Sequence, residues 1–497
     1  MNNFSRFTSV SYKFFYSLFT IALVWIIFLN TKVNILREPV ILVLVFLISV
    51  SFYYIWIRIP LESEELTRNN QSKSFEIIGW FLLFSFISVI GLTLRVAPGW
   101  DYGFIHRSAL EWAKTGHLED TSYFARYPNN NLILIITTIL YKVIHLVLPS
   151  LRDSGYVAIS IVFNSLMITT AIFFTSLSAK KLFGIKSKSL AVIFLILFTP
   201  VIFYAEILYT DTVGLLIISC IAFLLVKFLE NPNYMDLTLM SLLFIFGYKI
   251  KAFIAIILVA FLIVIFLKEK IHLKKKMIYI SIILISFIFG NIILSKGLDK
   301  LIGLDQEQYN QYQFPMVHWI TMSLNPKSDG GFIQDDFELI KDTHGVKNKE
   351  NLSKEILKNR VKELGTKGLL QHVLVKKMDR TWTKGSMAID DYAQRENVNS
   401  TILHDFFTLN GKHHHYYYVF SQATHLIMII LILVSTLFSF FKRKEAINVF
   451  SISIFGLALF LVIWECNSRY LYSFIPLFTL VSLNGIAMIP KKNSNQV

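Results

Sequence analysis

Apolar runs long enough to cross a membrane recur along almost the whole sequence. A hydrocarbon layer of about 30 Å requires roughly 20 apolar residues in an α-helix, which rises 1.5 Å per residue. The pattern therefore predicts an all-α polytopic membrane protein with about 12–13 transmembrane helices. The expected spans are 14–30, 39–57, 76–96, 157–178, 190–208, 212–229, 237–250, 252–267, 278–296, 417–440, 446–464 and 471–489.

One further apolar run, 130–148, does not fit this count. Lys142 and His145 interrupt it, and a crossing there would place Lys180–Lys188 on the opposite side from the other basic clusters. We therefore expect a juxtamembrane or re-entrant helix in the outer leaflet.

The expected spans 237–250 and 252–267 are short and meet between Lys249 and Lys251. A break in a helix at membrane depth is tolerated where it lines a wet cavity walled by protein. The sequence predicts such a cavity here.

Two longer polar stretches divide the chain, at 98–131 and 297–415. The first contains an amphipathic helix candidate at 104–115. The boundaries predict four parts: 1–75 with two additional N-terminal spans, 76–296 as a transmembrane core with the first outer loop 98–131, 297–415 as a mainly helical extracytoplasmic domain, and 416–497 with the last spans and a short cytoplasmic tail.

Composition supports a membrane protein, since 54% of the residues are hydrophobic, 16% are charged and mean hydropathy is +0.55. Soluble domains carry about 25% charged residues. The net charge of +15 could suggest nucleic acid, but the basic residues gather beside spans, where they set topology and contact anionic lipids. These clusters are Lys180–Lys188, Lys268–Lys276, Lys442–Lys444 and Lys491–Lys492.

A cytoplasmic N-terminus places all four basic clusters on the cytoplasmic side of the predicted topology. The sequence thus predicts a multi-pass protein of the cell (plasma) membrane that contacts membrane lipids and no nucleic acid. Both termini would be cytoplasmic and the active site extracytoplasmic. The two cysteines, Cys220 and Cys466, offer neither metal spacing nor a disulfide framework.

Candidate chemistry lies at the outer ends of the spans, because ionisable residues at membrane depth are costly and often functional. Asp101 follows the third span, and Asp211 lies between two spans at the same level. Each charged residue also has a structural explanation, since an acid can cap a helix and a Lys or Arg can extend to the interface. Other charged residues at this level are Glu206, Lys249, Lys251, Glu465 and Arg469.

Short motifs in a fixed order carry a resemblance. They are Asp101 followed by Arg126-Tyr127-Pro128-Asn129-Asn130, Lys180-Lys181-Leu182-Phe183-Gly184, Thr199-Pro200 with Thr210-Asp211, Gly247-Tyr248-Lys249-Ile250-Lys251, and Ser468-Arg469-Tyr470 before Pro476. In this order and sidedness they resemble membrane glycosyltransferases of the C-type fold, such as protein O-mannosyltransferases and lipid A aminoarabinose transferases. The match covers 76–300 well and 416–490 loosely.

The chain departs from those two relatives in three ways. Asn129 stands where they have a second proline, two additional spans precede their first, and 297–415 matches neither. That segment is more similar to segments of Gram-positive members of the family, through His318-Trp319, Gly330-Gly331 and Asp335-Asp336.

The resemblance implies transfer of a sugar from a polyprenyl-phosphate donor to a hydroxyl of an envelope glycan, glycolipid or protein, with inversion and an Asp general base. It implies Asp101 and Asp211 as catalytic residues, and Lys251, Arg469 and Lys249 as ligands of the donor phosphate. Acceptor or sugar contacts would come from Tyr127, Asn129, Asn130, Glu206, His318 and Trp319. His318 could equally belong to the core of the outer domain.

No residues are predicted to bind a metal, and no Asp-x-Asp motif for a nucleotide sugar is evident. A divalent cation, Mg²⁺ or Mn²⁺, stays open as a cofactor. Two other functions also stay open: a glycan polymerase or ligase with a diphosphate-linked lipid donor, and a transporter or flippase of lipid-linked sugars.

Overall fold

The structure is a computed structural model that describes residues 3–58, 70–394 and 401–488. Every regular element in these ranges is helical, as the apolar pattern predicts. The predicted tail cluster Lys491–Lys492 lies outside the described residues.

Ten helical stretches of the described residues are long and apolar enough to cross a membrane. The helices in them are α1 (Asn3–Asn30), α2 (Val40–Arg58), α3 (Asn70–Thr93), α6 (Asn131–Val147), α7 (Asp153–Phe183), α10 (Thr210–Glu230), α13 (Leu273–Ile302), α21 (His414–Ser439), α22 (Glu445–Ile463) and α23 (Ile475–Met488). The π-turn η1 (Thr31–Ile35) extends α1, the 3-10 turn η3 (Pro128–Asn130) begins the α6 stretch, and η7 (Ser468–Phe474) begins the α23 stretch.

One further apolar stretch is bent and counts as an eleventh span only if its two parts cross the membrane together. The helix α8 (Ile185–Leu197) meets α9 (Pro200–Phe203) and η4 (Tyr204–Glu206) at 70°. Pro200 opens α9, and because proline has no backbone N–H it cannot continue the hydrogen-bond ladder of α8. The bend of 70° changes the direction of the chain before α10 begins.

The count of ten or eleven is lower than the expected 12–13. The difference lies at the predicted break, where α11 (Tyr234–Ile250), η5 (Ala252–Ile254) and α12 (Ala255–Leu267) replace two full spans. At 13 residues α12 is shorter than a full crossing requires, and at 17 residues α11 is at the lower limit.

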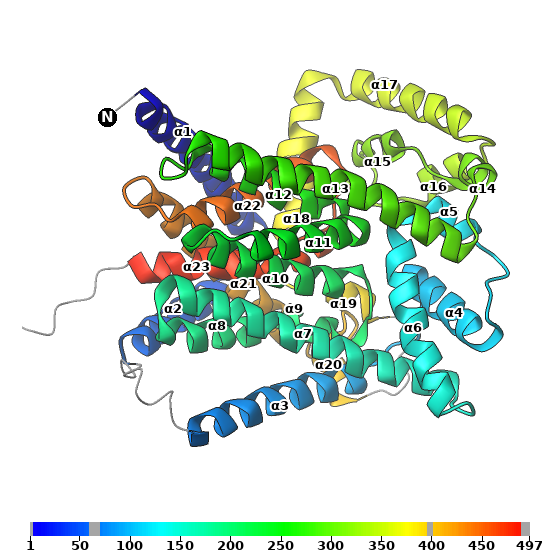
Figure 1. Ribbon diagram of the computed structural model, residues 1–497, viewed down its shortest axis with the longest axis horizontal. Helices are drawn as coiled ribbons and strands as arrows, with labels where there is room; N and C mark the ends of the chain where they lie inside the picture. The colour runs from blue at the N-terminus through cyan, green and yellow to red at the C-terminus, as the bar shows by residue number, and fades with distance from the viewer. Residues whose placement is uncertain (1–2, 59–69, 395–400, 489–497) are drawn as a thin grey trace, which may run out of the picture.

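The run at 130–148 forms α6, which meets the length and hydropathy of a span. Figure 1 nevertheless shows α6 running steeply across the ends of long helices such as α7 and α3. It packs against α4 (Trp100–Thr115), the amphipathic helix of the first polar loop. The short helix α5 (Ser122–Arg126) completes this loop.

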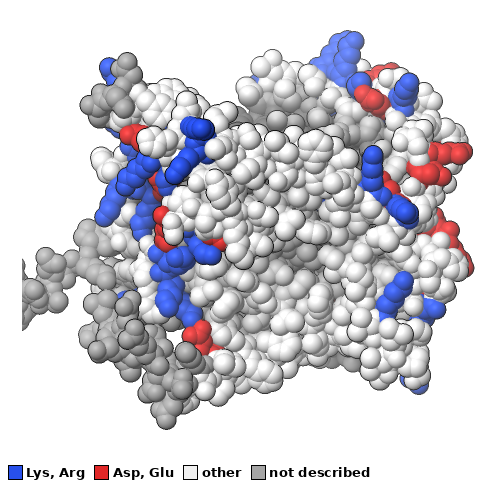
Figure 2. All heavy atoms as spheres, in the orientation of Figure 1, with Lys and Arg blue, Asp and Glu red and all other residues white. Residues whose placement is uncertain are grey.

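The basic clusters meet at one end of the bundle. Lys444 donates to the carbonyl of Leu182 (2.6 Å), Lys268 forms an ion pair with Glu445, and the Lys276 ammonium lies 4.8 Å from the Phe4 ring centroid. Figure 2 shows Lys and Arg gathered at this left-hand end, with a broad uncharged band beside it. The opposite end carries acidic and basic residues together.

The long polar segment supplies the helices at that opposite end: α14 (Gln306–Tyr312), α15 (Met316–Ser323), α16 (Gln334–Lys341) and α17 (Val346–Gln371). Asp305 starts α14 with a capping box. Inside α17, Gly365 has φ 58°, a conformation that favours glycine, and the helix changes direction there.

After α17 the chain enters the bundle through η6 (His372–Lys377), α18 (Met378–Trp382) and α19 (Ile389–Tyr392); α20 (Ile402–Phe407) follows. Asn30 donates to the carbonyl of Trp382 (3.1 Å) and Asn34 donates to that of Thr383 (2.9 Å). These bonds tie the polar segment to α1 and place α19 beside the helix ends that bear the charged residues.

Candidate functional site

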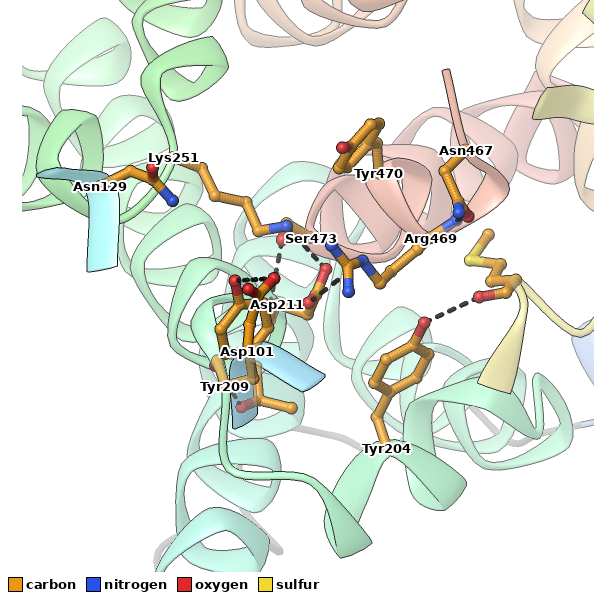
Figure 3. Close-up of polar contacts among 12 residues, drawn as sticks. Asp101, Asn129, Tyr204, Tyr209, Asp211, Lys251, Asn467, Arg469, Tyr470 and Ser473 are labelled. Carbon is orange, nitrogen blue, oxygen red and sulfur yellow. Dashed lines mark hydrogen bonds and ion pairs between the residues drawn. The ribbon is translucent and has the colours of Figure 1, made fainter. Parts of the chain in front are cut away.

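Four charged residues from four chain segments meet at the end of the bundle that bears the polar segment (Figure 3). Asp101 lies in the first turn of α4 and Asp211 in the first turn of α10. Lys251 lies between α11 and η5, and Arg469 lies in η7. Each occupies a helix start or break, where the chain can direct a polar side chain toward the bundle axis.

Asp211 and Lys251 form a buried ion pair. The Lys251 ammonium donates to Asp211 Oδ1 at 2.7 Å, and the two residues are 1% and 7% exposed. Arg469 Nε lies 3.8 Å from Asp211 Oδ2, beyond hydrogen-bond distance. Two cations thus surround the Asp211 carboxylate, and Asp101 supplies the second negative charge of the cluster.

Aromatic rings enclose the Arg469 guanidinium. Its central carbon lies 5.1 Å from the ring centroid of Tyr392, 5.4 Å from Tyr209, and 5.7 Å from both Trp100 and Tyr470. Cations and aromatic faces attract one another, more strongly where water is excluded. The rings therefore hold the guanidinium in one position.

Asp101 has neutral partners and is only partly buried. Tyr123 donates to Oδ1 at 2.7 Å and Tyr209 donates to Oδ2 at 3.2 Å. Asn130 donates to the Tyr123 hydroxyl oxygen at 2.7 Å. Burial, reinforced by Asp101, raises the pKa of Tyr123 well above its ordinary value, so this phenol stays protonated as a donor.

The two carboxylates are therefore suited to different tasks. Asp211 is committed to Lys251 and Arg469. A carboxylate has about four lone-pair sites, so Asp101 retains acceptor capacity beyond its two phenol bonds. A partly exposed carboxylate beside a fixed guanidinium can accept a proton from one group while the cation balances a neighbouring anion.

The structure brings some other predicted residues to this site. Asn130 is buried and also accepts from Tyr209 at 3.2 Å, while Asn129 is exposed and donates to Asn130 at 3.1 Å. Tyr127 and Trp319 pack against each other, with ring centroids 6.2 Å apart. This contact joins the first loop, which carries Tyr127, to the polar segment, which carries Trp319.

Three predicted residues point elsewhere. Lys249 turns away from Asp211 and donates to Ser295 at 2.5 Å. His318 is 1% exposed and packs against Phe314. It therefore lies in the core of the polar segment, which was the alternative to a sugar-binding role. Glu206 is fully buried, and neither carboxyl oxygen has a hydrogen-bond partner among the described residues.

The site also contains residues that the sequence analysis did not select. Tyr123 and Tyr209 bind Asp101, Ser473 donates to the Asp211 backbone carbonyl at 3.0 Å, and Tyr392 covers Arg469. Tyr209 adjoins Thr210-Asp211 and Tyr123 lies four residues before Tyr127, so proximity to the quoted motifs was the available signal.

No group of three His, Cys, Asp or Glu side chains that could hold a metal ion occurs among the described residues. The need for a divalent cation stays a prediction.

The helices and this charged site define a polytopic integral membrane protein. The chain belongs to the family described as "Conserved hypothetical integral membrane protein", whose model matches residues 4–487. Comparison with curated proteins gives no match.

Solved structures similar to this chain include two of ArnT from Cupriavidus metallidurans. The structure bound to undecaprenyl phosphate has 12% identity and a TM-score of 0.34, and the apo structure has 14% identity and a TM-score of 0.32. Each alignment covers 83% of this chain and 78% of the other.

Proposed function

We propose that the protein is a membrane glycosyltransferase of the C-type fold. It moves a sugar from a polyprenyl-phosphate donor to a hydroxyl of an envelope glycan, glycolipid or protein. The observation that carries this proposal is the pairing of a partly exposed carboxylate, Asp101, with an aromatic-enclosed guanidinium, Arg469, at one end of the spans. The ordered motifs of the sequence support the same reaction.

In the proposed step, the acceptor oxygen attacks the anomeric carbon and inverts it. Asp101 takes the hydroxyl proton as the new carbon–oxygen bond forms. The bond from the anomeric carbon to the phosphate oxygen breaks, and its electron pair leaves with the phosphate. Arg469 neutralises that phosphate, while Lys251 acts mainly through Asp211, with which it is paired.

The proposed location follows from the charge distribution. The end with the basic clusters would face the cytoplasm, together with both termini, and the site would face outward from the cell membrane. A lipid donor could then keep its isoprenoid tail in the hydrocarbon layer and present its phosphate at the level of Arg469.

The test is turnover of a radiolabelled polyprenyl-phosphate sugar in proteoliposomes. Asp101→Asn preserves size but cannot accept the proton, so sugar transfer should fall by at least about 10²-fold. Donor binding should stay nearly unchanged. Asp120→Asn, an exposed carboxylate of the same loop, is the matched control and should keep full turnover. Full turnover with Asp101→Asn would exclude Asp101 as the base.

The same assay separates the two other functions. A polymerase or ligase would consume only a diphosphate-linked donor. A transporter or flippase would move the labelled lipid between leaflets without cleaving it.

A further inference from the structure

A cavity lined mostly by polar side chains adjoins the turn of the first loop that carries Asn130. It has a volume of about 270 Å³, and its walls come from η3 and α6, the ends of α11 and α13, and α14. Pockets for drug-sized ligands start at about 300 Å³, so this cavity suits a smaller group, about one ring in size.

The cavity is lined by hydrogen-bonding side chains. Lys249 donates to Ser295 at 2.5 Å, and Tyr309 donates to Asp299 Oδ1 at 2.6 Å. Asn131 is 2% exposed, and its Oδ1 accepts no hydrogen bond from the described residues. The Lys249 ammonium has three donors and the Asp299 carboxylate about four lone-pair sites, so both keep hydrogen-bonding capacity for a ligand.

The charges in the cavity indicate the class of ligand. Lys249 and Asp299 bring opposite charges to the same walls, and Asp299 would repel a phosphate. Gln306 and Gln313 add uncharged amides, while Pro128 and Leu298 add small apolar surfaces. Amides, a carboxylate and apolar patches together suit a hydroxylated, uncharged ring.

The cavity is linked to the charged site through a single turn. Pro128 and Asn131 line the cavity, and the residues between them include Asn130, which binds both Tyr123 and Tyr209. Those two phenols hold Asp101. A ring in the cavity would therefore lie against the segment that orients the proposed base.

We propose that this cavity binds one uncharged sugar ring of the acceptor, with Gln306 and Asp299 among its ligands. The acceptor role depends on the proposed glycosyltransferase function, whereas sugar binding itself does not. Lys249 is then a cavity residue that positions Ser295 and the ring, rather than a ligand of the donor phosphate.

Binding can be measured by saturation-transfer NMR on the full chain in nanodiscs. The probes are the methyl glycosides of glucose, galactose, mannose and N-acetylglucosamine, with inorganic phosphate for comparison. At least one glycoside should bind the wild-type protein, and Gln306→Ala and Asp299→Asn should each weaken it about tenfold, as the loss of about 1.4 kcal/mol implies. Gln306 is exposed on α14, so its replacement leaves the fold intact. Gln311→Ala, on the same helix but outside the cavity, is the matched control.

Three results would overturn the cavity proposal: no glycoside binds, the variants bind as the wild type does, or phosphate displaces the glycoside. A second measurement separates the two proposals. Glycoside binding by a wild-type protein that transfers no sugar from the labelled donor would refute the glycosyltransferase function alone. Loss of transfer in Asp101→Asn with equal glycoside binding by all cavity variants would refute the cavity proposal alone.

Discussion

Two aspartates with the same sequence setting have different environments at the residue scale. Both lie in the first turn of a helix at a span end. Asp211 is 1% exposed between two cations, while Asp101 is partly exposed and bound by phenols. A buried charge needs a partner, so the loss of either member of the Asp211–Lys251 pair would leave an uncompensated buried charge.

Removal of the Lys251 ammonium should therefore destabilise the protein. Lys251→Met leaves Asp211 buried with only Arg469 at 3.8 Å, and breaking a buried pair costs about 3–5 kcal/mol. We expect a lower melting temperature in detergent and partial recovery in the double variant Asp211→Asn/Lys251→Met. Wild-type melting of Lys251→Met would mean that the pair is not needed for stability.

Gly214 allows the close packing behind this pair. A Cβ at this position would lie 2.7 Å from Ser473 Oγ and 3.8 Å from Lys251 Cδ. Gly214→Ala should destabilise the protein by about 1–3 kcal/mol through overpacking. The matched control is Gly79→Ala in α3, where nothing lies within 4 Å and alanine should be neutral or stabilising by about 0.5–1 kcal/mol. Equal melting temperatures of the two variants would contradict this packing argument.

The sequence could identify the charged members of the site but not their neutral partners. Asp101, Asp211, Lys251 and Arg469 stand out because charge at membrane depth is costly. Tyr209 does not, since tyrosines at span ends commonly form an interfacial belt. The contacts that give it a role reach Asp101 over a separation of 108 residues.

At the scale of elements, hydropathy predicted most spans because the apolar length of a helix is a local property. The short runs at 237–250 and 252–267 and the interrupted run at 130–148 already indicated that α11, α12 and α6 differ from ordinary spans, but how α6 lies against the other helices depends on packing. The end of α18 is held in the bundle by hydrogen bonds from the side chains of Asn30 and Asn34 to the backbone carbonyls of Trp382 and Thr383, which are far away in the sequence. No local pattern encodes such bonds.

The helices of the polar segment should give the fold an acid-sensitive core. Burial lowers the pKa of His318 to about 4, below its ordinary value near 6.5. Asp336 raises this pKa, while Arg360 and Lys349 lower it further. The unfolded chain therefore binds a proton between about pH 6.5 and pH 4 that the folded chain excludes, so stability should fall as pH drops through this window.

The measurement is the melting temperature between about pH 7.5 and pH 4.5. His318→Gln should flatten the acid-side decline relative to wild type, although it lowers stability at neutral pH. His344→Gln, an exposed histidine of the same segment, should retain the wild-type slope. An unchanged slope in His318→Gln would show that other groups cause the decline.

For the whole molecule, the two ends of the bundle differ in charge, and this difference predicts its orientation. Three basic clusters contact one another or the start of α1 at one end, and the proposed site lies at the other. Basic residues beside spans are retained in the cytoplasm, so the site should face outward.

Thiol labelling of intact cells tests this orientation in a background in which Cys220 and Cys466 are replaced by alanine. Lys275→Cys, exposed at the basic end, should resist a membrane-impermeant maleimide until the cells are lysed, whereas Asn351→Cys, exposed on α17, should react in intact cells. Equal labelling of both positions after lysis is the control for accessibility. The reverse pattern in intact cells would place Asp101 and Arg469 in the cytoplasm, where a donor with its sugar presented outside the membrane could not reach them. The proposed reaction would then have to be abandoned together with the topology, because both depend on the side of the membrane that the site faces.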